Sequence, residues 1–150
     1  MTLLKVVHIL GAATWLGCNV AQAFLGGMVG NASADVRAWY SEAGEKMAKV
    51  VYNAAGIVIL LTGIGMVSSK EHFGAEFSDP FVGIGFAAII IGAALGITVF
   101  APKNRALAAA VRSGSTGEET KLRSTIMAFG ILDTAIVVFT IGAMVYRLGA

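Results

Sequence analysis

The sequence predicts an all-α integral membrane protein, a four-helix bundle that forms a single transmembrane domain over residues 1–150. Of the 150 residues, 57% are hydrophobic and only 13% are charged. The apolar residues gather in four runs: Leu3–Met28, Val50–Ser68, Phe81–Ala101 and Ser124–Tyr146. Each run is close to the roughly 20 residues that a helix needs to cross the hydrocarbon core. Because lipid offers the backbone no hydrogen-bond partner, a spanning run must be helical.

The first run contains one charged residue, Lys5. Ala21-Gln22-Ala23 resembles a signal-peptide cleavage site, but the apolar run continues through Phe24–Val29, so we expect an uncleaved span. Cys18 is the single cysteine of the sequence and cannot form an internal disulfide.

The connection before the second run, Asn31–Lys49, mixes Trp39 and Tyr40 with charged residues. This mixture is typical of a helix that lies along the lipid headgroups. We therefore expect an amphipathic helix that turns into the second span, Val50–Ser68.

Pro80 and Pro102 flank the third run and predict its two ends, because proline starts helices readily and interrupts their interiors. Beyond the third span we expect the helix to continue over Arg105–Arg112 and to break at Ser113–Gly117, where serine and glycine cluster.

Basic residues predict the orientation of the bundle. Eight lie at one end and three at the other: Arg37, Lys46, Lys49, Lys103, Arg105, Arg112, Lys121 and Arg123 against Lys5, Lys70 and Arg147. Cationic loops stay in the cytoplasm. We therefore expect both termini on the outer, periplasmic side of a bacterial inner (plasma) membrane. Lipid headgroups suit this basic surface, and the sequence carries no nucleic-acid motif.

One polar stripe marks the first span. His8, Trp15, Asn19 and Gln22 fall on one side of a helix, and polar side chains in a span face the bundle interior. Two interpretations of His8 stay open. In one, glycines make room for a haem b, His8 binds its iron, and Trp15 packs beneath the ring.

Met66 or Met144 would then supply the second iron ligand, because both lie near the depth of His8 and His/Met ligation of haem iron is known. In the other interpretation, the glycines only let helices approach closely, and His8 bonds to a neighbour. The other histidine, His72, belongs to the outer loop. A zinc or copper cage is disfavoured because no second histidine or carboxylate is spaced with His8.

The fourth run contains Asp133, and an ionised acid near the bilayer centre costs about 2.5 to 3.5 kcal/mol on insertion scales. Its depth matches that of Asn19 on the first span. Asp133 either hydrogen-bonds Asn19 and pins the two spans together, which we favour, or belongs to a proton relay.

The segment Lys5-Val-Val-His8-Ile-Leu-Gly11, followed by Trp15 and Gly17, resembles the opening of a bacterial membrane superfamily. That superfamily includes CopD-type copper-resistance proteins, HemJ-type protoporphyrinogen oxidases and a family of uncharacterised four-span membrane proteins. The length and Leu61-Thr62-Gly63 make the uncharacterised family the closest resemblance, over the first two spans.

The resemblance implies that His8 is a haem- or porphyrin-associated residue and that Lys49 supports it; the CopD likeness implies copper handling. The chain departs from the HemJ pattern at Ala23–Gly27 and lacks a proline early in the second span.

Three functions follow. The first is haem or porphyrin binding near the outer leaflet, in a redox or porphyrin-handling role. The second is a non-catalytic accessory subunit that braces a larger membrane complex. The third, least favoured, is transport of copper or a small solute, which would need a dimer. Gly26–Gly30 and Gly92–Gly96 have the small-residue spacing of close helix contacts and would permit self-association.

Overall fold

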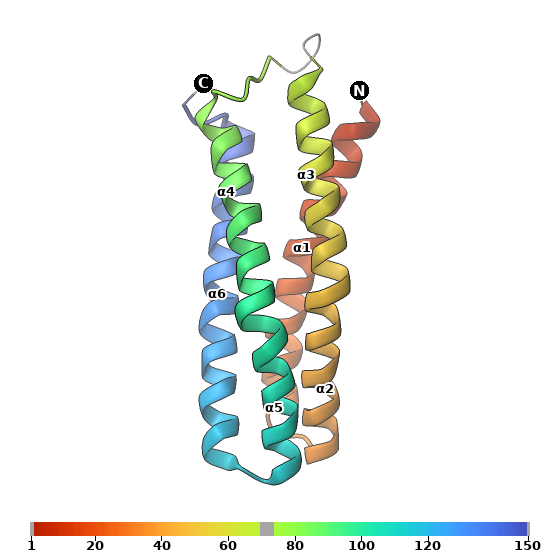
Figure 1. Ribbon diagram of the computed structural model, residues 1–150, viewed down its shortest axis with the longest axis vertical. Coiled ribbons are helices and arrows are strands. Elements are labelled where there is room, and N and C mark those ends of the chain that lie inside the picture. Colours follow the sequence, from red (N-terminus) through yellow and green to blue (C-terminus); the bar gives the residue numbers. More distant parts are fainter. Residues whose placement is uncertain (1, 70–73, 150) are drawn as a thin grey trace.

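Four helical rods run side by side in the computed structural model, which describes residues 2–69 and 74–149 (Figure 1). The first rod is α1 (Thr2–Val29) and the fourth is α6 (Thr116–Tyr146). The second joins α2 (Ala34–Met47), a π-helical turn η1 (Ala48–Tyr52) and α3 (Asn53–Ser68). The third joins α4 (Pro80–Leu95), a second π-helical turn η2 (Gly96–Phe100) and α5 (Ala101–Ser113).

Each rod is long and apolar enough to span a membrane, so the predicted all-helical, four-span architecture is confirmed. The outer surface of the bundle is apolar as well. Leu3, Phe24, Ile97 and Val145 are each between 68% and 74% exposed. Large side chains of this kind are stable at such exposure when acyl chains rather than water surround them.

The start of α1 and the end of α6 lie at the same end of the bundle (Figure 1). We call this the terminal end. The opposite end, where α1 is followed by α2 and α5 by α6, carries the eight basic residues counted above, and we call it the charged end. That the terminal end faces the periplasm stays a prediction.

The expectation that the first connection turns before the second span is wrong. α2 continues through η1 into α3 as one rod, and its length packs along α5 (Figure 1). Ala38 of α2 is buried with Leu107 and Val111 of α5, and Leu122 and Ile126 of α6 pack against them. This small apolar core fixes α2 against α5 and α6, while Trp39 of α2 remains 65% exposed.

Ion pairs complete the charged end. Glu45 of α2 accepts hydrogen bonds from Arg105 of α5 at 2.6 Å and from Lys49, one turn along its own rod. Arg112 of α5 pairs with Glu42 of α2. Because Glu45 and Glu42 of α2 pair with arginines of α5, α2 can run parallel to the bundle axis beside α5.

Pro102 differs from expectation too. It lies in the first turn of α5, and the chain passes through it without a break. A proline inside a helix removes one N–H and crowds the carbonyl four residues earlier. The π-helical turn η2 directly before it widens the helix, which relieves that clash. The helix ends instead at Gly114, whose φ of 71° is the left-handed cap that glycine adopts readily.

Candidate functional site: a cavity inside the bundle

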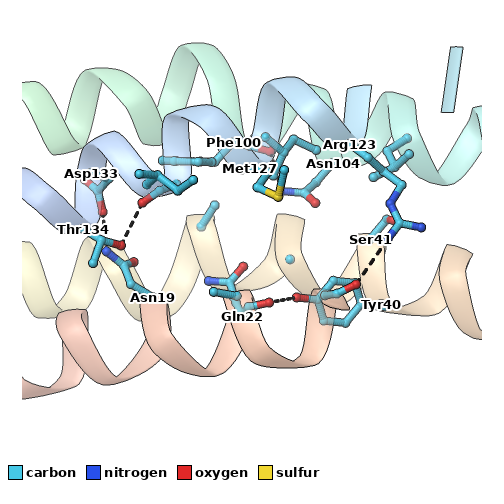
Figure 2. A pocket seen from close by; sticks show the side chains of 18 of the residues that line it. Asn19, Gln22, Tyr40, Ser41, Phe100, Asn104, Arg123, Met127, Asp133 and Thr134 are labelled. Carbon is cyan, nitrogen blue, oxygen red and sulfur yellow. Dashed lines mark hydrogen bonds between the residues drawn. The ribbon is translucent and has the colours of Figure 1, made fainter. Parts of the chain in front are cut away.

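A cavity of about 800 Å³ lies inside the half of the bundle nearer the charged end. Its lining residues come from all four rods, and Figure 2 shows how they face one another. Asp133, Thr134 and Asn19 lie at one end of the cavity, and Arg123, Tyr40 and Ser41 lie at the other (Figure 2). A ligand site in a protein typically encloses about 300 to 1,000 Å³, so the cavity is large enough for a small molecule.

Asp133 borders the inner part of the cavity near the middle of α6, and the lining on this helix ends at Val138. Asp133 is 3% exposed, and its Oδ2 accepts hydrogen bonds from Trp15 Nε1 at 2.9 Å and from Asn19 Nδ2 at 2.8 Å. The structure thus brings Asp133 and Asn19 together, the contact expected from their depths. Trp15 is a further partner that the sequence analysis had assigned to another role.

A chain of hydrogen bonds continues from Asp133 along the cavity wall. Asn19 Oδ1 accepts from the hydroxyl of Tyr52 at 2.7 Å, and that hydroxyl accepts from Gln22 Nε2 at 2.6 Å. One turn closer to the charged end, the Tyr40 hydroxyl donates to the backbone carbonyl of Gln22. Trp15, Asn19 and Gln22 of the polar stripe therefore do face the interior, and their partners come from η1, α2 and α6.

Trp15 separates the cavity from the terminal half of the bundle. The indole is 7% exposed and lies between two glycines: a Cβ at Gly56 of α3 would be 3.4 Å from it, and a Cβ at Gly92 of α4 would collide with it. Its ring also meets that of Tyr52 edge to face, with centroids 5.8 Å apart. One side chain of α1 therefore contacts all three other rods.

Two arginines and one acid lie at the charged end of the cavity. Arg37 of α2 pairs with Glu119 of α6 at 2.8 Å, and Arg123, one turn along α6, lies 3.9 Å from the same carboxylate. Arg123 also donates to the backbone carbonyl of Gly26 at 3.2 Å. Two cations against one anion leave an excess positive charge where the cavity meets the expected headgroup level.

Between these ends the cavity wall is mostly apolar. It includes Phe100, Met127 and Ile131, and several glycines contribute no side chain at all. At Gly96 and Gly130, an added Cβ would meet nothing within 4 Å. The two π-helical turns lie in this wall, since Tyr52 belongs to η1 and Gly96 to η2. Turns of this kind often mark functional sites.

His8 lies outside this cavity. The half-buried imidazole rests against α3, where its Nδ1 is 3.1 Å from the Ile59 carbonyl and 2.9 Å from the Thr62 hydroxyl. A hydrogen on Nδ1 donated to the carbonyl leaves Nε2 with a free lone pair, which is how ligating histidines are commonly oriented.

The other residues expected around a haem lie at different places in the bundle. Met144 lies on α6 against Gly85 of α4, whereas His8 contacts α3. Met66 lies on α3, one turn beyond Thr62, and neither methionine lines the cavity. Trp15, expected beneath the ring, is committed to Asp133. His8 as an iron ligand therefore stays a prediction that rests on the orientation of its own ring.

Lys49, the residue implied to support His8, pairs instead with Glu45 at the charged end. His72 and Lys70 lie outside the described residues. Within the described ranges, 2–69 and 74–149, no group of three or more histidine, cysteine, aspartate or glutamate side chains could hold a metal ion.

The fold and the cavity define a multi-pass helical membrane protein with an internal binding-sized space. Comparison with protein-family models, curated proteins and solved structures finds no match for this chain. The resemblance to CopD and HemJ proteins accordingly stays an expectation from the opening residues.

The glycine spacings carried a signal that the sequence analysis assigned differently. Gly92–Gly96 and Gly26–Gly30 were interpreted as close helix contacts. In the structure Gly92 makes room for the Trp15 indole, Gly96 borders the cavity, and Gly30 makes room for the Arg123 guanidinium. The side chains that fill the gaps at Gly92 and Gly30 come from other rods, which spacing alone does not reveal.

Proposed function

We propose that this protein is a membrane-embedded binding protein whose cavity holds a single-chain anionic amphiphile, such as a fatty acid. The observation that carries the proposal is the polarity of the cavity. An apolar shaft leads into the bundle from a cluster with two guanidinium groups and one carboxylate. A molecule with a negative head and a long apolar body matches that arrangement.

The dimensions of the cavity support the same ligand class. On α6 its lining runs from Glu119 to Val138, and these 19 residue steps correspond to a rise of about 28 Å. A volume of about 800 Å³ over that length makes the space long and narrow. An extended chain suits such a space better than a broad ring system does.

Charge at the charged end supports the assignment of the head group. Glu119 compensates one of the two arginines, and a bound carboxylate would compensate the other. Arginine presents its donors in a planar fork that binds carboxylate or phosphate oxygens through two bonds. The head of the ligand would therefore lie beside Arg123, with its chain directed toward Asp133.

A cavity-filling pair of variants tests the proposal. Gly130→Leu would place an isobutyl group in the cavity, where the structure has room for it. Gly142→Leu, on the same helix, also meets no neighbour but does not border the cavity. We expect Gly130→Leu to weaken binding of a fluorescent fatty acid at least about tenfold, or ~1.4 kcal/mol. Gly142→Leu should bind like the unsubstituted protein.

Two comparisons separate the possible outcomes. A fatty acid and a two-chain anionic phospholipid are titrated in parallel. Tighter binding of the phospholipid would support an anionic head group but refute the proposal that the ligand has a single chain. Equal binding by both glycine variants would refute the cavity as the site. Copurification with a larger membrane complex, without any fatty-acid binding, would favour the accessory-subunit alternative instead.

Haem binding through His8 is the second candidate, and the observation that favours it is the Nδ1 contact with the Ile59 carbonyl. With a hydrogen on Nδ1 donated to that carbonyl, Nε2 would keep the lone pair that binds iron in a redox or porphyrin-handling role. The test is the visible spectrum of the purified protein after haem is added. A Soret band that His8→Ala abolishes would support it, and a spectrum identical for both proteins would refute it.

A further inference from the structure

The Asp133 carboxyl group has one oxygen that the protein leaves open. Both hydrogen bonds, from Trp15 and Asn19, go to Oδ2. Oδ1 lies 3.7 Å from the position that a Cβ of Gly92 would take, and glycine leaves that side uncovered. Among the described residues, every side-chain nitrogen or oxygen that is fully buried has a hydrogen-bond partner, so an atom without one must be accessible. Oδ1, which has no hydrogen bond there, therefore faces the cavity that Asp133 and Gly92 both line.

This asymmetry determines where a proton would sit. Oδ2 already accepts two N–H groups, so a neutral Asp133 must carry its hydrogen on Oδ1. A proton that joins or leaves Asp133 must then pass through the cavity. Intramembrane acids that exchange protons are a recurring device in membrane proteins.

Access to Oδ1 differs between the two ends of the bundle. Toward the charged end, the cavity runs as far as Arg123 and Glu119. Toward the terminal end, the lining stops at Val138 on α6 and at Trp15 on α1. The Trp15 indole fills the space between α3 and α4 there and is held by its bond to Asp133 itself. The same tryptophan that bonds Oδ2 thus blocks the path on the far side.

We propose that Asp133 is a proton-binding site that exchanges with one side of the membrane only, the charged end, through the cavity and with Trp15 as the seal. Water in the cavity delivers a proton to Oδ1, which converts the carboxylate into the neutral acid, and the reverse step returns it to the same side. The proposal does not depend on which molecule the cavity binds.

The groups that face Asp133 leave it as the main acid of this site. Tyr52 of η1 interacts with it electrostatically, and Tyr52 in turn interacts with Cys18 of α1. α4 presents Gly92. On α6 itself, the next charged residue toward the charged end is Arg123.

Infrared difference spectroscopy tests the proton site directly. The pH-dependent band of a protonated carboxylic acid in a non-aqueous setting should be present in the intact protein and lost in Asp133→Asn, which keeps the shape and the acceptor oxygen. Asp35→Asn, at an exposed position in the first turn of α2, is the matched control and should keep the band. A band that survives Asp133→Asn would overturn the assignment.

Cysteine labelling in sealed vesicles tests the sidedness. Thr134→Cys in a Cys18→Ser background places a thiol in the cavity beside Asp133. Leu132→Cys on the same helix lies outside the cavity and is the control, while exposed Arg112→Cys reports which side is the charged end. A membrane-impermeant thiol reagent should label Thr134→Cys at least about tenfold faster from the charged end.

Adding Trp15→Ala tests the seal and should allow labelling of Thr134→Cys from both ends. Trp15→Phe keeps an aromatic ring in place, so labelling of Thr134→Cys should still come from the charged end only. Equal labelling from both ends with Trp15 intact would refute the seal. Absence of labelling from either end would show a closed cavity and refute the access path. Both of these refuting results are measured with Trp15 intact, so they do not depend on whether a Trp15 variant folds.

Discussion

Replacement of Gly92 by alanine tests the packing on which the cavity depends. A Cβ at this position would collide with the Trp15 indole, which has little freedom to move because Gly56 bounds its other side. Insertion of a methyl group into a packed interior typically costs about 1 to 3 kcal/mol. If the indole shifts far enough to lose its bond to Asp133, an unpaired buried group adds about 1 to 3 kcal/mol more.

Helix propensity works in the opposite direction, and a matched variant measures it. Alanine is favoured over glycine inside a helix by roughly 0.5 to 1 kcal/mol. Gly142→Ala on α6 would meet no neighbour within 4 Å and should receive that gain alone. We therefore expect Gly142→Ala to be equal to or more stable than the parent, and Gly92→Ala to be about 1 to 3 kcal/mol less stable than Gly142→Ala.

The free energy of unfolding of the three proteins in detergent micelles, titrated with a denaturing detergent, provides the comparison. Trp15 fluorescence reports the environment of the indole in the same samples, after Trp39 has been replaced by phenylalanine in all three. Stability of Gly92→Ala equal to that of Gly142→Ala, with unchanged emission, would contradict the tight Trp15 packing described above.

Three further outcomes are expected. Tyr52→Phe removes the hydroxyl that links Asn19 to Gln22 and should lower the free energy of unfolding by about 1 to 3 kcal/mol, measured as above; no loss would exclude a stabilising role for that link. Hydrogen bonds from Arg105 and Lys49 hold the pKa of Glu45 below its ordinary value, so its carboxylate stabilises the fold above that ordinary pKa, and this contribution is lost as the pH falls through the lowered pKa. Glu45→Gln should therefore reduce the acid sensitivity of a thermal melt, and an unchanged pH profile would count against it. Gly30→Leu should displace the Arg123 side chain and weaken fatty-acid binding, whereas Gly117→Leu, which meets no neighbour, should not.

The sequence predicted the number of helices because the bilayer imposes length and polarity on every span. It also predicted the Asn19 and Asp133 contact, since two polar groups at one depth in lipid have few other partners. It did not predict that α2 continues the second rod, because that outcome depends on Glu45 and Glu42 meeting arginines of α5. Nor did it predict the cavity, which exists only once several rods are placed around it.

Trp15 illustrates why the site was the harder part. Its position on the polar stripe of α1 was evident from helical periodicity. Its partners, Gly56, Gly92 and Asp133, lie on three different rods, and no local pattern states which glycine faces which side chain. The sequence therefore located the residue but assigned it to the neighbourhood of His8.

The two π-helical turns have a consequence for how this bundle could change over evolutionary time. Each one accommodates a surplus residue relative to a regular helix, and one residue corresponds to about 100° of rotation around the axis. Deletion of a single codon in η1 or η2 would therefore restore regular α-helical geometry. The helix that follows would then be rotated about its own axis relative to the helix that precedes it. A lineage could in this way exchange the side chains that border the interior without any substitution, and its span lengths would scarcely alter.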